Sequence, residues 1–145
     1  MKLTGKKLLI LGATAGEISL VKRAQEYGVY VIVTDNHTDY ILAPAKNVAD
    51  EAWDVSWSDI DTLEKLSREK EIDGVLAGYS EFRVENMIKL CKRLNLPCYI
   101  NDEQLEITRD KIKFKDCCRK YGVPVVKEYA SIDGNGIKLS GAFWL

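Results

Sequence analysis

The chain has 145 residues, of which 46% are hydrophobic and 30% charged, and its formal net charge is −1. This length suits one domain whose core is large enough to need no disulfide or metal. The even charge balance provides no basic surface for nucleic acid. No apolar run approaches the roughly 20 residues that a membrane-spanning helix needs. We therefore expect no nucleic-acid partner and no membrane partner.

The four cysteines are Cys91, Cys98, Cys117 and Cys118, and the only histidine is His37. Four cysteines are compatible with two disulfides or a metal site, but no CxxC spacing is present. We favour small apolar side chains in a reducing compartment. The N-terminus also lacks the apolar region and cleavage site of a signal peptide. The sequence thus predicts a cytoplasmic protein without a bound metal.

The first half of the chain alternates strand and helix patterns. The run Lys7–Leu11 is continuously apolar, as in a strand covered on both faces. A glycine turn follows it, and apolar residues at helical spacing then predict a helix from Ile18 to Tyr27. Val29–Thr34 is a second buried strand that ends at Asp35, and Glu51–Trp57 alternates like a third, peripheral strand. Residues 36–50 are less regular.

The second half continues the alternation. Ser58 or Asp59 is suited to cap a helix whose apolar pattern extends to Ile72. The elements expected after it are a strand at Gly74–Ala77, a helix at Glu81–Leu94, a fifth strand at Pro97–Ile100, a short helix at Asp102–Ile107, a helix at Lys111–Tyr121 anchored by Ile112, Phe114, Cys118 and Tyr121, and a strand over Val123–Tyr129.

The end of the chain has a different pattern. Residues 130–139 predict a strand pair around an Asp-Gly-Asn-Gly turn at 133–136. The last five residues, 141–145, are largely apolar, and such a terminus normally packs against something. We expect it to make contacts that favour a dimer.

Alternating strands and helices predict an α/β fold with a doubly wound, mainly parallel sheet. We expect about five strands in the order 3-2-1-4-5. Such sheets bind ligands beyond the carboxyl ends of their strands. The candidate site therefore combines Gly12–Glu17, Asp35–Asn36 and Gly78–Glu81.

The turn Gly12–Glu17 permits three interpretations. It lacks the second glycine of a dinucleotide fingerprint, because Thr14 stands there, which weakens the hypothesis of NAD binding. Glu17 suits the N-terminus of a helix for structural reasons. It equally suits a ligand that carries an amine or a hydroxyl.

Three further positions each have a structural and a functional interpretation. Asp35 either makes the turn after its strand or binds a ribose hydroxyl. Glu81 is either a first-turn acid of its helix or part of the ligand edge. The basic stretch Thr108–Lys115 is either a solvated helix face or a phosphate site at a helix N-terminus.

The order of these features over residues 6–129 resembles the N-terminal, Rossmann-like domain and linker of ATP-grasp enzymes. Among these are biotin carboxylases, carbamoyl phosphate synthase large subunits, and glycinamide ribonucleotide ligases and transformylases. The first turn contains Gly16-Glu17-Ile18, the second strand ends in Asp35, and the fourth leads to Glu81. The most specific match is the linker: Asp110-Lys111, an amphipathic helix, and then Gly122-Val123-Pro124.

The resemblance implies roles for individual residues. Lys111 would contact ATP phosphates, while Gly16, Glu17, Asp35 and Glu81 would bind the acceptor substrate, with no catalytic residue in this chain. The implied chemistry is an acyl phosphate formed from ATP and displaced by an amine, with Mg²⁺ on the phosphates.

The resemblance also implies a division of the chain into a substrate-side domain (1–107), a linker helix and strand (108–129) and an atypical tail (130–145). The larger ATP-binding part would lie outside these residues, so we expect neither catalysis nor tight ATP binding by the chain alone. The expected partners are a small-molecule substrate, the missing ATP-grasp domain and a second copy of the chain. The alternatives are a stand-alone ligand-binding or regulatory domain and a small NAD(P)-dependent oxidoreductase domain.

Overall fold

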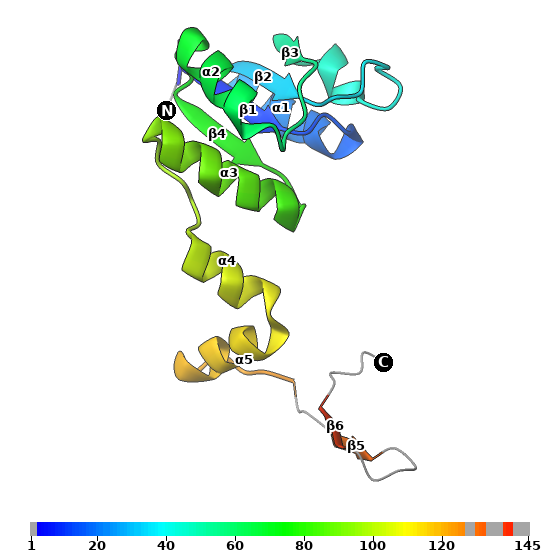
Figure 1. Cartoon of the computed structure of the whole chain (residues 1–145), viewed down its shortest axis with the longest axis vertical. Helices are drawn as coiled ribbons and strands as arrows, with labels where there is room; N and C mark the ends of the chain where they lie inside the picture. The colour runs from blue at the N-terminus through cyan, green and yellow to red at the C-terminus, as the bar shows by residue number, and fades with distance from the viewer. Residues whose placement is uncertain (1–2, 127–129, 133–137, 141–145) are drawn as a thin grey trace. The chain divides into compact units, whose positions relative to one another are not determined.

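The structure is a computed structural model that describes residues 3–126, 130–132 and 138–140 (Figure 1). The chain divides into two compact units, Met1–Leu105 and Glu106–Leu145.

The first unit contains a four-stranded sheet in which every neighbouring pair is parallel. Its strands are β1 (Lys7–Leu11), β2 (Tyr30–Thr34), β3 (Glu51–Trp53) and β4 (Gly74–Ala77), in the order β3-β2-β1-β4. The doubly wound α/β fold expected from the sequence is confirmed, with the first four strands in the predicted order. The carboxyl ends are level, since Leu11 is paired with both Thr34 and Ala77.

Helices cover both faces of this sheet (Figure 1). On one face, Leu9, Leu11 and Ile32 pack with α2 (Ile60–Lys70) and α3 (Glu81–Leu94). On the other face, Ile10, Val31 and Val33 pack with α1 (Ile18–Glu26) and with the short 3-10 helix η2 (Pro44–Asn47). Successive strand residues point to opposite faces, so continuous apolar runs are what a sheet covered on both sides requires.

The predicted fifth strand, Pro97–Ile100, is wrong, because the structure has no strand there. Its alternation is real, since Cys98 and Ile100 pack against the core while Tyr99 is exposed. Pro97 has no N–H to donate to a β-ladder. The segment contacts the end of β4 through a hydrogen bond from the Tyr99 hydroxyl to the Ala77 carbonyl, at 3.4 Å.

The helix α4 (Asp102–Arg109) crosses the boundary between the units, and α5 (Lys111–Lys120) lies in the second. The predicted helix over Lys111–Tyr121 is confirmed, but its proposed anchors are not buried. Ile112, Phe114 and Tyr121 are exposed, and Cys118 is half-buried. An apolar stripe is buried only where another element covers it, and the described residues of the second unit bury no side chain of α5.

The predicted strand pair near the end of the chain is confirmed as β5 (Ala130–Ile132) antiparallel to β6 (Lys138–Ser140). Its turn, 133–136, and the apolar segment 141–145 lie outside the described residues. Of the strand expected over Val123–Tyr129, residues 123–126 are irregular and 127–129 are not described. Among the described helices, none is long and apolar enough to cross a bilayer.

Candidate functional site

The turn that follows β1 is built around the carboxylate of Glu17. This residue ends the short 3-10 helix η1 (Ala15–Glu17) and is 1% exposed. Its Oε2 accepts hydrogen bonds from the Thr14 backbone N–H at 2.9 Å and from the Thr14 hydroxyl at 2.6 Å. The N–H that a dinucleotide site would offer to a phosphate is therefore already used inside the turn.

The other Glu17 oxygen, Oε1, forms an ion pair with Arg83 of α3 at 2.9 Å. The backbone makes room for this pair at two glycines. A Cβ at Gly12, where φ is +108°, would lie 2.3 Å from Arg83 Nη1, and a Cβ at Gly78 would lie 2.8 Å from Glu17 Oε1. The Arg83 guanidinium also lies 5.9 Å from the centre of the Trp57 ring. The ion pair thus joins the ends of β1 and β4.

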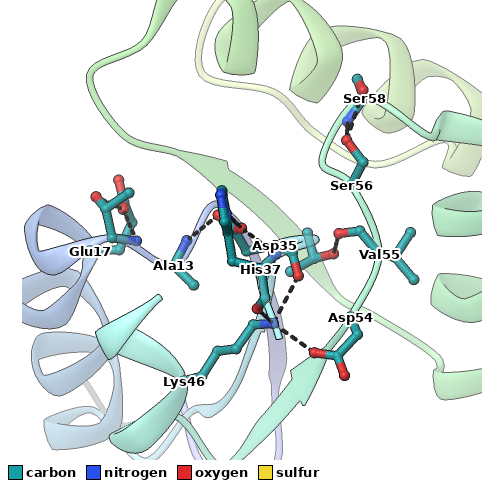
Figure 2. Close-up of polar contacts among 11 residues, drawn as sticks. Ala13, Glu17, Asp35, His37, Lys46, Asp54, Val55, Ser56 and Ser58 are labelled. Atoms are coloured by element: carbon teal, nitrogen blue, oxygen red, sulfur yellow. Dashed lines mark hydrogen bonds and ion pairs between the residues drawn. The ribbon is translucent and has the colours of Figure 1, made fainter. Parts of the chain in front are cut away.

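Asp35 joins the ends of β1 and β2 in the same way (Figure 2). It is 3% exposed. Its Oδ2 accepts from the Ala13 backbone N–H at 3.4 Å, and its Oδ1 accepts from the His37 backbone N–H at 3.0 Å. The Oδ1 also lies 2.6 Å from the Nδ1 of the His37 ring.

These contacts set the charge of Asp35. Burial by itself raises the pKa of the carboxyl, but hydrogen bonds from the His37 backbone, the His37 ring and the Ala13 backbone outweigh it. The pKa of Asp35 is therefore lower than usual, and the group is an anion at neutral pH.

Lys46 is the least expected member of this region, because its side chain is completely buried. Its ammonium group donates to the Asp35 carbonyl at 2.8 Å, the His37 carbonyl at 2.5 Å and Asp54 Oδ1 at 2.6 Å (Figure 2). Three acceptors satisfy the three donors of an ammonium group, which a buried charge requires. Lys46 thereby ties the segment after β2 to the segment after β3.

Two further predicted residues lie at the same edge. Glu81 begins α3 and is exposed. Gly16 contributes its carbonyl oxygen, which accepts a hydrogen bond from the exposed Tyr79 hydroxyl at 3.2 Å. The structure thus brings Gly16, Glu17, Asp35 and Glu81 to one edge of the sheet, where Glu81 is exposed, Gly16 is half-buried, and the two other side chains are buried.

Lys111 lies in the second unit, exposed at the first position of α5. The Asp110 carboxylate caps this helix and accepts from the backbone N–H groups of Ile112 at 2.8 Å and Lys113 at 3.1 Å. An open hollow of about 510 Å³ is lined by residues 106 and 109–113. Asp110 already accepts from these N–H groups. An anion that binds at the start of α5 would therefore contact mainly the basic side chains around it.

Sequence reasoning missed three residues of the site: Arg83, Lys46 and the ligand-edge position of His37. Arg83 follows Glu81 by two residues, and that spacing does not predict a contact between Arg83 and the turn after β1. Lys46 lies in an irregular segment where no pattern marked it as buried. Among the described residues, no cluster of His, Cys, Asp and Glu is arranged to hold a metal ion.

Comparison with known proteins gives this arrangement a family context. No family model matches the chain. Its structural neighbours and sequence relatives are ATP-grasp enzymes, and the chain matches the N-terminal domain of an ATP-grasp ligase-type enzyme. The resemblance drawn from the sequence is thereby confirmed.

Two relatives are formate-dependent phosphoribosylglycinamide formyltransferases. The one from Prochlorococcus marinus is 29% identical over 119 residues, which are 82% of this chain and 30% of that protein. The one from Sulfolobus acidocaldarius is 30% identical over 110 residues, which are 76% of this chain and 27% of that protein.

Solved structures of related enzymes also match the fold of this chain. Phosphoribosylglycinamide synthetase from Anaerococcus prevotii matches with a TM-score of 0.64 and 29% identity, covering 90% of this chain and 32% of its own. N5-carboxyaminoimidazole ribonucleotide synthetase from Thermotoga maritima matches with a TM-score of 0.67 and 29% identity, covering 88% and 34%. The chain spans about a third of the length of the proteins it matches.

Replacing Arg83 by methionine tests the ion pair. The Arg83→Met variant leaves the buried Glu17 carboxylate without its cation. We expect the free energy of unfolding to fall by about 2–3 kcal/mol. This is less than the loss on breaking a fully buried ion pair, because Arg83 is partly exposed. Arg93→Met, in the last turn of the same helix, removes only exposed ion pairs with Asp61 and Glu64 and should change stability much less. Urea denaturation measures both, and equal losses would show that Glu17 does not depend on Arg83.

The lowered pKa of Asp35 predicts a pH dependence of stability. A carboxyl whose folded-state pKa lies below its unfolded value stabilises the fold fully above the unfolded value and loses that contribution as pH falls through the folded one. The stability advantage of the wild type over Asp35→Asn should therefore be constant near pH 5 and shrink as pH falls below about 4, the ordinary range of the group. Urea denaturation between pH 5 and pH 2 measures it, and an advantage that grows in acid would contradict the assignment.

Proposed function

We propose that the chain forms the acceptor-side domain of an ATP-dependent carboxylate–amine ligase. The observation that carries the proposal is the edge where β1, β2 and β4 end, which brings the exposed His37 and Glu81 and the half-buried Gly16 together with two buried carboxylates. Ligands of open parallel sheets bind beyond this edge. The match to ATP-grasp relatives at 29–30% identity supports the same assignment.

The names of the relatives suggest the kind of acceptor. Three of these proteins are named for phosphoribosylglycinamide and a fourth for N5-carboxyaminoimidazole ribonucleotide. We therefore propose that the acceptor is a phosphoribosylated compound with an amine. In the whole protein, ATP would convert a carboxylate to an acyl phosphate, in outline the route of carbamoyl phosphate synthase, and the amine would displace the phosphate.

ATP and Mg²⁺ would be bound mainly by residues outside those described. Lys111 is suited by charge and exposure to contact a phosphate. One such contact contributes on the order of 1–3 kcal/mol, whereas micromolar affinity requires roughly 8 kcal/mol. We propose that this chain alone is inactive, that it works in the cytoplasm as a homodimer, and that an ATP-grasp domain on the same or another polypeptide completes the site.

A spectroscopic titration tests the proposal. Phosphoribosylglycinamide added to the ¹⁵N-labelled chain should shift backbone amide signals at residues 12–17, 35–37 and 78–81. Ribose 5-phosphate, which lacks the amine, should shift them much less. Mg-ATP should bind in the millimolar range or more weakly, with its effects near residues 109–113.

Two outcomes of this titration would contradict the proposal. If phosphoribosylglycinamide shifts no amide of the first unit, the edge is not an acceptor site for this compound. If Mg-ATP binds the first unit with micromolar affinity, the edge is a nucleotide site and the proposed division of roles is wrong.

A further inference from the structure

The only histidine of the chain, His37, lies at the proposed acceptor site, and one of its two ring nitrogens is in contact with Asp35. The Nδ1 of His37 lies 2.6 Å from Asp35 Oδ1. Its backbone is fixed as well, because its N–H donates to Asp35 and its carbonyl accepts from the buried Lys46. The side chain is nevertheless 52% exposed. A half-exposed ring anchored at both the backbone and one nitrogen is well ordered and accessible to a ligand.

The state of Asp35 determines which ring nitrogen carries the proton. An ionised carboxylate only accepts hydrogen bonds, so the short contact requires Nδ1 to be the donor. In the neutral ring, the second nitrogen, Nε2, then has a free lone pair and accepts a hydrogen bond. Buried carboxylates orient histidine rings in this way in many active sites.

We propose that His37 Nε2 is the hydrogen-bond acceptor that this site presents to an N–H donor of the ligand's amine, and that Asp35 acts on the ligand only through the His37 ring. This inference rests on the proposed function for the identity of the ligand. It replaces a direct role of Asp35, whose oxygens are buried and bonded to Ala13 and His37.

Glu17 is the obvious competitor for the amine, and its geometry counts against it. It is 1% exposed, and its two oxygens are taken by Thr14 and Arg83. An amine would have to displace Arg83 to reach it. The other charged groups joined to the His37 segment are Lys46, which is fully buried, and Asp54, which lies after β3, is 57% exposed and binds Lys46 through Oδ1. Beside the β1 turn, His37 Nε2 is thus an accessible acceptor, whereas Glu17 is not.

Because the chain has one histidine, its ring gives a single set of imidazole signals. Long-range ¹H–¹⁵N spectra of the wild-type chain, taken where the spectrum shows a neutral ring, should report the Nδ1–H form. Addition of phosphoribosylglycinamide should shift the Nε2 signal, and ribose 5-phosphate should not. An Nε2–H form, or an unchanged Nε2 signal while amides 12–17 shift, would overturn the inference.

A pair of variants provides an independent readout. In His37→Asn, the amide nitrogen replaces Nδ1 and keeps the contact with Asp35, but nothing replaces Nε2. In His37→Gln, the amide extends to the position of Nε2. We expect His37→Asn to weaken the affinity for phosphoribosylglycinamide about tenfold, the effect of one hydrogen bond, and His37→Gln to restore part of it.

Equal affinities of wild type and His37→Asn would contradict the role of Nε2 even though the ligand binds. If phosphoribosylglycinamide shifts no signal of the wild-type chain, both the proposed acceptor and this inference for it are wrong. The tautomer, measured without ligand, still reports separately whether Asp35 orients the ring.

Discussion

The ion pair between Glu17 and Arg83 is the contact on which the arrangement of loops at the carboxyl edge of the sheet depends. It joins the turn after β1 to the first turn of α3, and it brings the guanidinium against the backbone of Gly12. Gly12 and Gly78, which lack a Cβ, leave the space that the two side chains of this ion pair occupy. Because Glu17 also binds the backbone and hydroxyl of Thr14, one buried carboxylate fixes both the shape of the turn and the position of the helix.

Asp35 and Lys46 are also buried charged residues that join loops, in their case the loops after the neighbouring strands. Asp35 links the β1 turn to the segment after β2, and Lys46 links that segment to Asp54 after β3. Buried charges are costly unless each finds a partner, so these residues hold one arrangement of the loops in preference to others. The groups left at the surface, His37 and Glu81 among them, are presented by this buried framework.

Patterns of apolar residues were sufficient to predict the architecture. The runs that form β1 and β2 and the spacing within α3 identified the elements and their parallel order, because burial on both faces leaves a clear signal. Pro97–Ile100 failed because alternation reports which side chains face the core and does not report backbone pairing. The apolar stripe of α5 identified the helix but not whether another element covers it.

The chemistry of the edge was only partly predictable. Topology placed Glu17, Asp35 and Glu81 together, since strand ends in a parallel sheet meet at one edge. Sequence could not show that Glu17 and Asp35 are buried, because burial depends on partners distant along the chain. Arg83 lies 66 residues from Glu17, and Lys46 has all its acceptors in loops without a periodic pattern.

We propose that the close packing around Glu17 and Arg83 shapes the acceptor site. Gly74, the first residue of β4, and Gly78, which follows the strand, allow a matched test. A Cβ at Gly78 would press on Glu17 Oε1 at 2.8 Å, whereas a Cβ at Gly74 would meet Leu8 at an ordinary 3.6 Å. Calorimetry with phosphoribosylglycinamide should show affinity reduced about tenfold or more in Gly78→Ala and unchanged in Gly74→Ala. Equal affinities in the two folded variants would contradict the claim.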